Sequence, residues 1–474
     1  MTLAERFPDL YRYLRSEAGP IRLIAGFFTA NFICLCIFVA LGEMKERWSI
    51  LFHSVLWLQM LPILIFGTLR ATGSIFQERA ERTWDFQRLT PLTSFEITFG
   101  KLFGAPIFAY FLFFSMLPWT FLAAFASPEI PWGMVYEKYR LPVAIAFFCL
   151  NLGLLVSAHS MEGKQGRFVN ASGAFIGLMA ALQWASGGVL LQLMQKFSPN
   201  QTVSFWGIRF TPEGFTLFTL FSFGIWAFFG AKWRIGEDLL ERRPFWRFPA
   251  FLIFYAWYSL GIEAGVNPTG NLAAAMANQP PPTPPTPEAA NLLAHAQIVL
   301  MLSYLAGFVY VAAFLWPERA DYWRRWLRSR GLSSGLDQAP IWVLGYAAVL
   351  LTAAVLAALS RLGIYGVWNR FLVLLPIFLG RDLFFLQWCR FTRSRRADGM
   401  ALVYLTLAYA LPPLLLFPFH PEDKIYLFAP YPQPGTGFLL NIFPGLIQFV
   451  SVAAVALFRL SRSPSVSIER GDVP

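Results

Sequence analysis

Long apolar runs separated by short polar segments dominate this chain. The stretches 102–128, 168–195 and 425–458 contain no Asp, Glu, Lys or Arg, and each exceeds the roughly 20 residues that cross a hydrocarbon core of about 30 Å. The pattern predicts an all-α polytopic membrane protein with about 12 transmembrane helices. The predicted spans are residues 21–42, 49–69, 102–126, 141–160, 168–194, 214–231, 249–265, 291–316, 341–360, 367–388, 401–418 and 436–458.

Composition excludes a soluble globular domain. Of the 474 residues, 56% are hydrophobic and 14% are charged, whereas soluble domains average roughly 25% charged residues. Residues 1–19 are polar and carry no apolar core with a small-residue cleavage site, so we expect no cleavable signal peptide. The first helix is therefore expected to stay in the mature protein.

The basic excess of the chain indicates membrane topology. The formal net charge is +11, and with the N-terminus inside, 28 Lys and Arg fall in inside segments and 8 in outside segments. This asymmetry follows the positive-inside rule and predicts that both termini lie inside. We expect a multi-pass protein of the plasma membrane, in a bacterium the inner membrane, whose basic side chains contact lipid headgroups and bind no nucleic acid.

Two halves of six spans each are visible, residues 1–240 and residues 241–474. In each half the second span is followed by that half's largest inside segment, 70–101 and 317–340. The triplet Glu78-Arg79-Ala80 recurs as Glu318-Arg319-Ala320. Because many transporters are built from repeats, helix count and loop position together predict an internal duplication.

The segment 70–101 is too polar to cross the bilayer and suits its surface. Ser74 with Gln77 and Thr93 with Glu96 both match the capping-box pattern that starts a helix. Pro91 disfavours helical geometry at the preceding residue and is expected to end the first of these helices. The prediction is a short interfacial helix, a tight break and a re-entry into the membrane.

Eight residues of this segment stand in an order that resembles the signature of ABC-2 type transporter permeases. They are Glu78, Thr83, Asp85, Leu89, Pro91, Glu96, Gly100 and Lys101. In that family a Glu and a Thr-x-acidic element precede Leu, Pro, Glu-Ile and Gly-Lys. The region follows the second of six helices and contains the coupling helix that docks on a separate ATPase subunit.

The resemblance implies a membrane-spanning permease subunit of an ATP-driven exporter, with the eight residues as its ATPase-coupling set. It implies a partner ATPase dimer that binds ATP and Mg²⁺, and no cofactor on this chain. Six-span members dimerise, whereas twelve spans supply a complete membrane domain in one polypeptide; a homodimer stays open as an alternative. Arg82 and Trp84 stand where the family has Gly and Leu, and the segment 317–340 lacks the Thr-x-acidic and Gly-Lys elements. The second docking surface is therefore expected to be divergent or lost.

No catalytic motif is found in the sequence. There is no GxxxxGK[ST] phosphate loop and no HExxH, the four His are scattered, and the four Cys form no CxxC. The chain is therefore expected to be a transport subunit and not an enzyme. The alternatives are a membrane-embedded transferase or polymerase acting on lipid-linked substrates, an accessory membrane protein, and, for 70–101 alone, an ordinary solvated loop with an amphipathic helix.

A few polar residues fall inside the predicted spans. Gln59, Gln183 and Gln448 are candidates to line a transport pathway, although such amides more often join helices by hydrogen bonds. Arg381 and Asp382 are expected to pair with other groups or to reach the interface, in preference to forming a proton relay.

Overall fold

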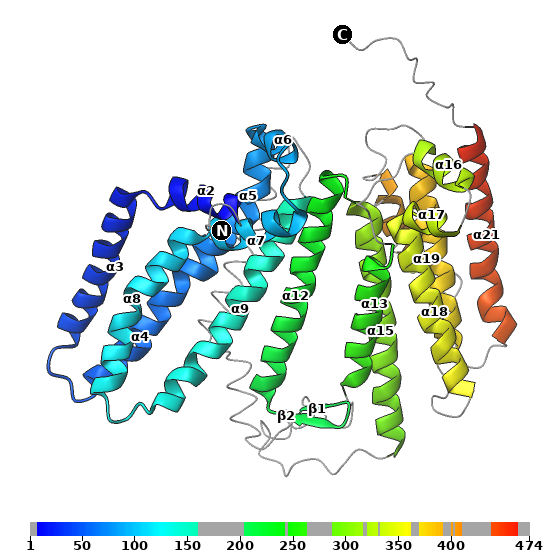
Figure 1. The fold of residues 1–474 in the computed structure, drawn as a ribbon. Helices are drawn as coiled ribbons and strands as arrows, with labels where there is room; N and C mark the ends of the chain where they lie inside the picture. The colour runs from blue at the N-terminus through cyan, green and yellow to red at the C-terminus, as the bar shows by residue number, and fades with distance from the viewer. Residues whose placement is uncertain are drawn as a thin grey trace, which may run out of the picture. The chain divides into compact units, whose positions relative to one another are not determined.

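The computed structural model is mostly helical (Figure 1). It describes residues 7–159, 203–241, 245–262, 287–315, 320–329, 332–361, 369–391, 400–401, 403–409 and 438–462. Across these residues nine helices are long and apolar enough to cross a membrane. The fold is therefore that of a multi-pass membrane protein.

Each of the nine candidate spans overlaps one span predicted from the sequence. They are Pro20–Leu41, Arg47–Ala80, Ile107–Ala126, Trp132–His159, Pro212–Asp238, Gln297–Phe314, Ile341–Ala358, Phe371–Arg390 and Leu439–Arg462. Predicted span 168–194 lies outside the described residues, and 401–418 is described only in part. Predicted span 249–265 corresponds to a helix of 15 residues, Arg247–Gly261, which is shorter than the roughly 20 that a perpendicular crossing needs.

By its internal contacts the chain divides into two compact units, one mainly up to Arg243 and one mainly from Pro244 onward. In unit 1 the helices are α2 (Pro8–Glu17), α3 (Pro20–Leu41), α4 (Arg47–Leu61), the π-helix η1 (Pro62–Gly67), α5 (Thr68–Ala80), α6 (Thr83–Arg88), α7 (Ser94–Gly104), α8 (Ile107–Ala126), α9 (Trp132–His159) and α12 (Pro212–Asp238). Two short strands, β1 (Val203–Phe205) and β2 (Ile208–Phe210), precede α12.

The core of unit 1 lies where α9 packs against α12 and α5, and α4 packs against α8. The outer helix α3 buries only Gly26, Ala30 and Cys34, which share one face at a spacing of four residues. Most of its other side chains are apolar, and many of these are exposed, among them Phe28 and Phe32. Such a face suits lipid and would be unfavourable in water.

The second span is one helical run of 34 residues, Arg47–Ala80, that passes through η1. Pro62 has no N–H to donate and its ring clashes with the carbonyl one turn earlier, so an α-helix cannot continue unchanged through it. A wider π turn accommodates the proline and keeps the run continuous. Ser74 lies inside this run, not at a helix start, so the first predicted capping box is wrong.

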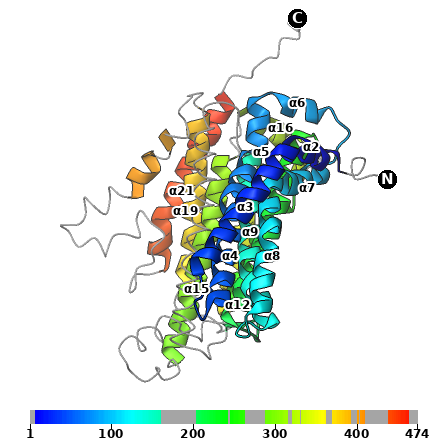
Figure 2. The same ribbon diagram turned by 90° about the vertical axis from the view of Figure 1, so that its left-hand side faces the viewer.

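The third predicted span, 102–126, is divided in the structure. α7 ends at Gly104, and α8 begins at Ile107 after Pro106. The missing N–H of Pro106 is tolerated at a helix start but not within a helix, so the chain turns there. α7 packs on α2, and α8 alone forms the candidate span (Figure 2).

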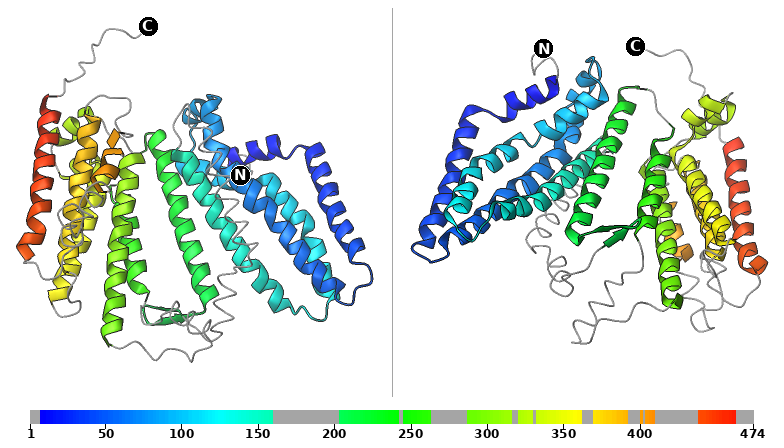
Figure 3. Two further views of the ribbon diagram at one scale, coloured as in Figure 1. Left: turned by 180° about the vertical axis from the view of Figure 1, so that it is seen from behind. Right: turned by 60° about the horizontal axis from the view of Figure 1, so that its bottom comes forward.

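Unit 2 contains α13 (Arg247–Gly261), α15 (Pro287–Leu315), α16 (Ala320–Arg328), α17 (Leu332–Asp337), α18 (Ile341–Arg361), α19 (Asn369–Arg390) and α21 (Phe438–Arg462). α18 packs against α13, α15 and α19, and α19 packs along α21 (Figure 3). The core is apolar and includes Leu302, Trp342 and Leu375. Short α16 buries Trp323 against Trp342, with ring centroids 5.6 Å apart.

Candidate functional site

The segment 70–101 contains the last residues of the second span, up to Ala80, followed by two short helices at one end of unit 1 (Figures 1 and 2). α5 ends at Ala80, and Arg82 then adopts a left-handed backbone with φ of 60° before α6 begins at Thr83. In the family that the sequence resembles, glycine stands at this position. Glycine adopts left-handed φ without steric cost, whereas other residues lose about 1–2 kcal/mol. The turn thus has a glycine-type conformation, although the residue is arginine.

The second predicted capping box is confirmed. The Thr93 hydroxyl accepts from the backbone N–H of Glu96, and the Glu96 carboxylate accepts from the backbone N–H of Thr93 at 2.9 Å. Pro91 is exposed in the break between α6 and α7. The predicted break at Pro91 and the helix that starts after Thr93 are therefore present. The predicted helix before the break is divided in two, because its first part belongs to α5, which ends at Ala80, and only Thr83–Arg88 forms α6.

Glu78 and Lys101, 23 residues apart, form a buried ion pair. The Lys101 side chain is completely buried. The other carboxylate oxygen of Glu78 accepts from Arg12, from the Tyr13 hydroxyl at 3.1 Å and from the Gln87 amide at 3.3 Å. Glu78 and Lys101, far apart in the motif, therefore contact each other directly, and α2 contacts Glu78 through Arg12 and Tyr13.

A second carboxylate, Asp9, completes this group. Its Oδ1 accepts from the Gln87 amide at 3.1 Å and pairs with Arg12 at 2.8 Å, while its Oδ2 lies 3.9 Å from Lys101 Nζ. We call Asp9, Arg12, Glu78 and Lys101 the Glu78 ion cluster. Two carboxylates and two cations balance one another, which buried charges require.

The electrostatics of the cluster favour a charged lysine. Burial alone would lower the pKa of Lys101, but Tyr13, Asp9 and Glu78 together raise that pKa above its ordinary value. For Asp9, burial outweighs the nearby Lys101 and Arg12 and raises the pKa of the carboxyl. The folded structure thus stabilises the charged form of Lys101 and destabilises the charged form of Asp9.

Gly100, another predicted residue, lets α2 approach α7. A Cβ built on Gly100 would lie 2.9 Å from the Asp9 Cβ and 3.1 Å from the Leu10 backbone nitrogen. A Cβ on Gly104, one turn later, would lie 2.8 Å from the Tyr13 Cβ. Any side chain at these positions would push α2 away and separate Asp9 and Arg12 from Glu78.

Trp84 packs the inner side of α6 against the neighbouring helices α5 and α7. Its ring is buried, with Lys101 Nζ 5.5 Å and the Arg79 guanidinium 5.6 Å from the ring centre. Arg79 in turn pairs with Asp238 at the end of α12 and donates to the Ala158 carbonyl at 3.3 Å. The departure from the family leucine at this position therefore supplies an aromatic ring between two cations.

The outer side of α6 faces solvent. The Asp85 side chain is 67% exposed, Phe86 is 72% exposed and Leu89 is 84% exposed. Asp85 has a loose ion pair with Arg88 at 3.6 Å. We call Asp85, Phe86 and Leu89 the α6 face, an acidic and apolar patch of the kind that marks an interaction surface.

The same segment is tied to the end of α12. Arg88 Nε donates to the Asp238 carbonyl at 2.9 Å, and both the backbone N–H and the hydroxyl of Ser94 donate to the Glu241 carboxylate, at 2.8 and 2.7 Å. Thr83 donates to the Glu78 carbonyl at 3.2 Å. Any displacement of α6 would therefore be passed to α2, α5, α7 and α12 together.

The structure thus separates the eight predicted residues into three groups. Glu78, Gly100 and Lys101 are buried, and Asp85, Leu89 and Pro91 are exposed. Thr83 and Glu96 make local hydrogen bonds to the backbone. Sequence reasoning missed Asp9, Arg12 and Phe86. The first two lie in a short helix with charges of both signs, and nothing in its sequence indicates the distant partner. Phe86, by contrast, stands between two motif residues and could have been recognised.

The predicted pathway glutamines have hydrogen-bond partners where the structure describes them. Gln59 is buried, donates to the Phe113 carbonyl at 3.0 Å and lies 2.8 Å from the Tyr139 hydroxyl. Gln448 accepts from Arg381 at 2.7 Å. Gln183 lies outside the described residues. These contacts join helices, and a pathway role stays a prediction.

Among the described residues, no group of three or more His, Cys, Asp or Glu is placed to hold a metal ion. Comparison with family models, with curated proteins and with solved structures finds no match to this chain. The geometry of the segment 70–101 and the resemblance of its sequence are therefore the features of this chain that indicate a function.

Proposed function

We propose that this chain is the membrane-spanning permease subunit of an ATP-driven transporter of the ABC-2 type, working as an exporter with a separate ATPase dimer that binds ATP and Mg²⁺. The observation that carries the proposal is the division of the motif residues in 70–101. Those that a docking surface needs, Asp85 and Leu89, are exposed, and those that a rigid support needs, Glu78 and Lys101, are buried. An ordinary solvated loop requires neither feature.

The proposal includes twelve spans with both termini inside, in the plasma membrane. The nine described candidate spans and the distribution of Lys and Arg support it. In this arrangement the α6 face lies on the cytoplasmic side, where ATP is available to a partner. Two six-span halves supply a complete membrane domain for one ATPase dimer, and the homodimer stays the alternative.

The mechanism follows from how α6 is attached. When the ATPase subunits close, the one docked at the α6 face pushes α6. Because Trp84 and the Glu78 ion cluster fix α6 to α2, α5 and α7, the push moves these helices as one body. α5 continues into the membrane as the run Arg47–Ala80, so the movement reaches the second span directly. No bond is made or broken by this chain.

The experiment is co-purification with the product of a neighbouring gene that encodes a phosphate-loop ATPase. Asp85→Lys and Leu89→Arg change exposed side chains and leave the ion cluster intact. Each is expected to reduce the co-purified ATPase about tenfold or more, as for an interface hot spot, and to abolish the stimulation of its ATP hydrolysis. A well-folded Leu89→Arg protein that keeps its full complement of ATPase would refute docking at this face.

The matched control is Glu137→Lys, an exposed charge reversal near the start of α9. The end of α9 contacts Arg79 through Ala158, so Glu137 lies at the opposite end of unit 1 from the α6 face. This variant is expected to retain ATPase binding. A neighbouring cluster of sugar-transferring genes, with no ATPase that binds the chain, would instead favour the transferase alternative.

A further inference from the structure

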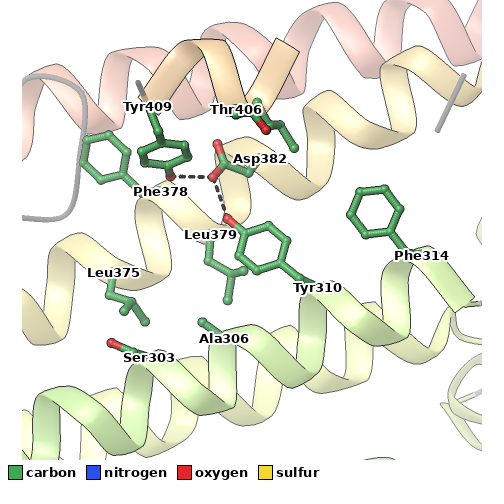
Figure 4. A pocket seen from close by; sticks show the side chains of 11 residues that line it. Ser303, Ala306, Tyr310, Phe314, Leu375, Phe378, Leu379, Asp382, Thr406 and Tyr409 are labelled. Atoms are coloured by element: carbon green, nitrogen blue, oxygen red, sulfur yellow. Dashed lines mark hydrogen bonds between the residues drawn. The ribbon is translucent and has the colours of Figure 1, made fainter. Parts of the chain in front are cut away.

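A cavity of about 470 Å³ lies within unit 2, between α15, α19 and the helical residues 403–409 (Figure 4). One face of α15 contributes Ala306, Tyr310 and Phe314, and one face of α19 contributes Leu375, Phe378, Leu379 and Asp382 at helical spacing. The volume falls within the range of small-molecule sites, roughly 300–1,000 Å³. Its wall is apolar apart from the hydroxyls of Ser303 and Thr406 and one polar end.

That polar end is the Asp382 carboxylate. Asp382 is buried, and it lies inside the candidate span Phe371–Arg390. The hydroxyls of Tyr310 and Tyr409 both donate to Oδ2 at 2.5 Å, approaching from opposite sides of the cavity (Figure 4). An ionisable residue within a span is costly and is commonly kept for function.

The charge of Asp382 is compensated by its neighbour. Arg381 Nε donates to Oδ1 at 2.7 Å, and Arg381 also donates to Gln448 at 2.7 Å. The guanidinium lies 4.6 Å from the Phe378 ring centre and 5.2 Å from that of Tyr409. The expectation that these two residues pair with other groups is confirmed, and they also pair with each other. The polar end therefore carries no uncompensated charge.

The hydrogen bonds decide what this end offers to a ligand. Each tyrosine has a single hydroxyl proton, and in both residues that proton is donated to Asp382. The Ser303 proton is likewise donated, to the Val299 carbonyl at 2.7 Å. What these hydroxyls and the carboxylate still present to the cavity is oxygen lone pairs, which accept hydrogen bonds.

We infer that this cavity binds an amphipathic small molecule with an apolar body and a hydrogen-bond donor, a hydroxyl or an ammonium, directed at the Tyr310, Asp382 and Tyr409 oxygens. An analogue in which a methyl ether replaces the hydroxyl has no hydrogen-bond donor, and its ether oxygen would lie against the acceptor oxygens of the cavity. Such an analogue is therefore expected to bind more weakly. The inference depends only on unit 2 and is independent of the proposed docking of an ATPase. It assigns a role to Asp382 that neither a proton relay nor a purely structural pair requires.

The test measures binding of three probes to the full chain in lipid nanodiscs by equilibrium dialysis against empty nanodiscs. The probes share a naphthalene body: 2-(1-naphthyl)ethanol, 2-(1-naphthyl)ethylamine and the methyl ether of the alcohol. At least one donor probe is expected to bind about tenfold tighter than the ether, and the tighter of the two identifies the head group. Equal binding of all three, or no binding above empty nanodiscs, would overturn the inference.

Two variants place the binding in this cavity. Ala306→Phe fills the space and is expected to abolish binding, whereas Ala354→Phe, on an exposed position of α18, makes the same change outside the cavity and is expected to keep it. Asp382→Asn places an amide N–H donor at the polar end, where it can donate to the ether oxygen. The preference of the cavity for the donor probe over the ether is therefore expected to fall at least several-fold. Helical circular dichroism and a single size-exclusion peak verify the fold. Unchanged binding in folded Ala306→Phe protein would overturn the inference even if Asp382→Asn cannot be purified.

Discussion

At the scale of single residues, the Glu78 ion cluster buries charges of both signs within unit 1. Lys101 is completely buried and contacts two carboxylates, so removing its charge leaves Glu78 and Asp9 with Arg12 alone. Uncompensated buried charge is far more costly than a buried pair is beneficial. The effect of a substitution here therefore depends on whether charge balance is kept.

Lys101→Met is expected to destabilise the protein by about 3–5 kcal/mol, because it breaks a buried pair. The double variant Glu78→Gln with Lys101→Met removes one charge of each sign and is expected to recover most of that loss. Thermal unfolding of the purified protein in detergent measures both. A double variant as unstable as the single one would contradict a charge-balance explanation.

The pH dependence of Asp9 has a definite sign. Burial raises the pKa of Asp9 above 3.8 in the folded protein, so its contribution to stability is greatest below that value and is lost as pH rises through the folded-state pKa. Asp9→Asn leaves no uncompensated buried cation, because the Arg12 side chain is 43% exposed to water and still pairs with Glu78. The variant is therefore expected to unfold at about the same temperature as the unmodified protein near pH 3.5, and to be the more stable of the two at pH 7. Melting curves across this range measure the difference. A gap that closes with rising pH would refute it.

Arg82 offers a test of backbone strain. Because its φ of 60° suits glycine, Arg82→Gly is expected to keep the turn and to raise stability by up to about 1 kcal/mol, less the entropy that glycine loses on folding. Arg82→Ala, which keeps the Cβ, is the control and is expected to give no such gain. A destabilised Arg82→Gly protein would show that the arginine side chain contributes more than its strain costs.

At the scale of elements, local signals were readable and distant contacts were not. The capping box at Thr93 depends on residues within one turn, and it was predicted correctly. The same pattern at Ser74 failed because the preceding residues continue a helix, which leaves no free N–H groups to cap. The approach of α2 to α7 at Gly100 joins residues about ninety positions apart, and no local pattern reports such a contact.

The two capping patterns predict opposite mutational results. Thr93→Ala removes a true cap and is expected to cost about 1 kcal/mol. Ser74→Ala is expected to change stability little, because its hydroxyl only donates back to the Ala71 carbonyl within the helix. Thermal unfolding of the two variants side by side makes the comparison. Equal losses would mean that the helix assignments are wrong.

At the scale of the whole molecule, the apolar pattern predicted most of the architecture. Nine predicted spans coincide with candidate spans among the described residues, because length and hydropathy alone decide whether a helix can cross a membrane. Shape within a span was predicted less well. A proline disturbs a helix, but the sequence does not say whether the result is a π turn, as at Pro62, or a division, as at Pro106. At the polar end, Asp382 was recognised from the sequence but its two tyrosine partners were not, because Tyr310 and Tyr409 are ordinary residues until helices bring them together.

The orientation of the chain is tested by cysteine labelling in intact cells. In a background with Cys34, Cys36, Cys149 and Cys389 replaced, Leu89→Cys is expected to react with a membrane-impermeant maleimide only after the cells are permeabilised. Glu137→Cys is expected to react without permeabilisation, because the proposed topology puts it outside. Labelling at position 89 in intact cells would reverse the topology and with it the proposed docking.

The length of the second span has a mechanical consequence. At 1.5 Å per residue the 34-residue run Arg47–Ala80 is about 51 Å long, which exceeds a hydrocarbon core of about 30 Å by about 20 Å. In the proposed topology the helix therefore has a part of about 30 Å within the bilayer and a shorter part of about 20 Å that projects from it on the side of α6. Tilting about the bilayer surface, such a helix moves its far tip further than the projecting part that is pushed, by about one and a half times for a stiff helix.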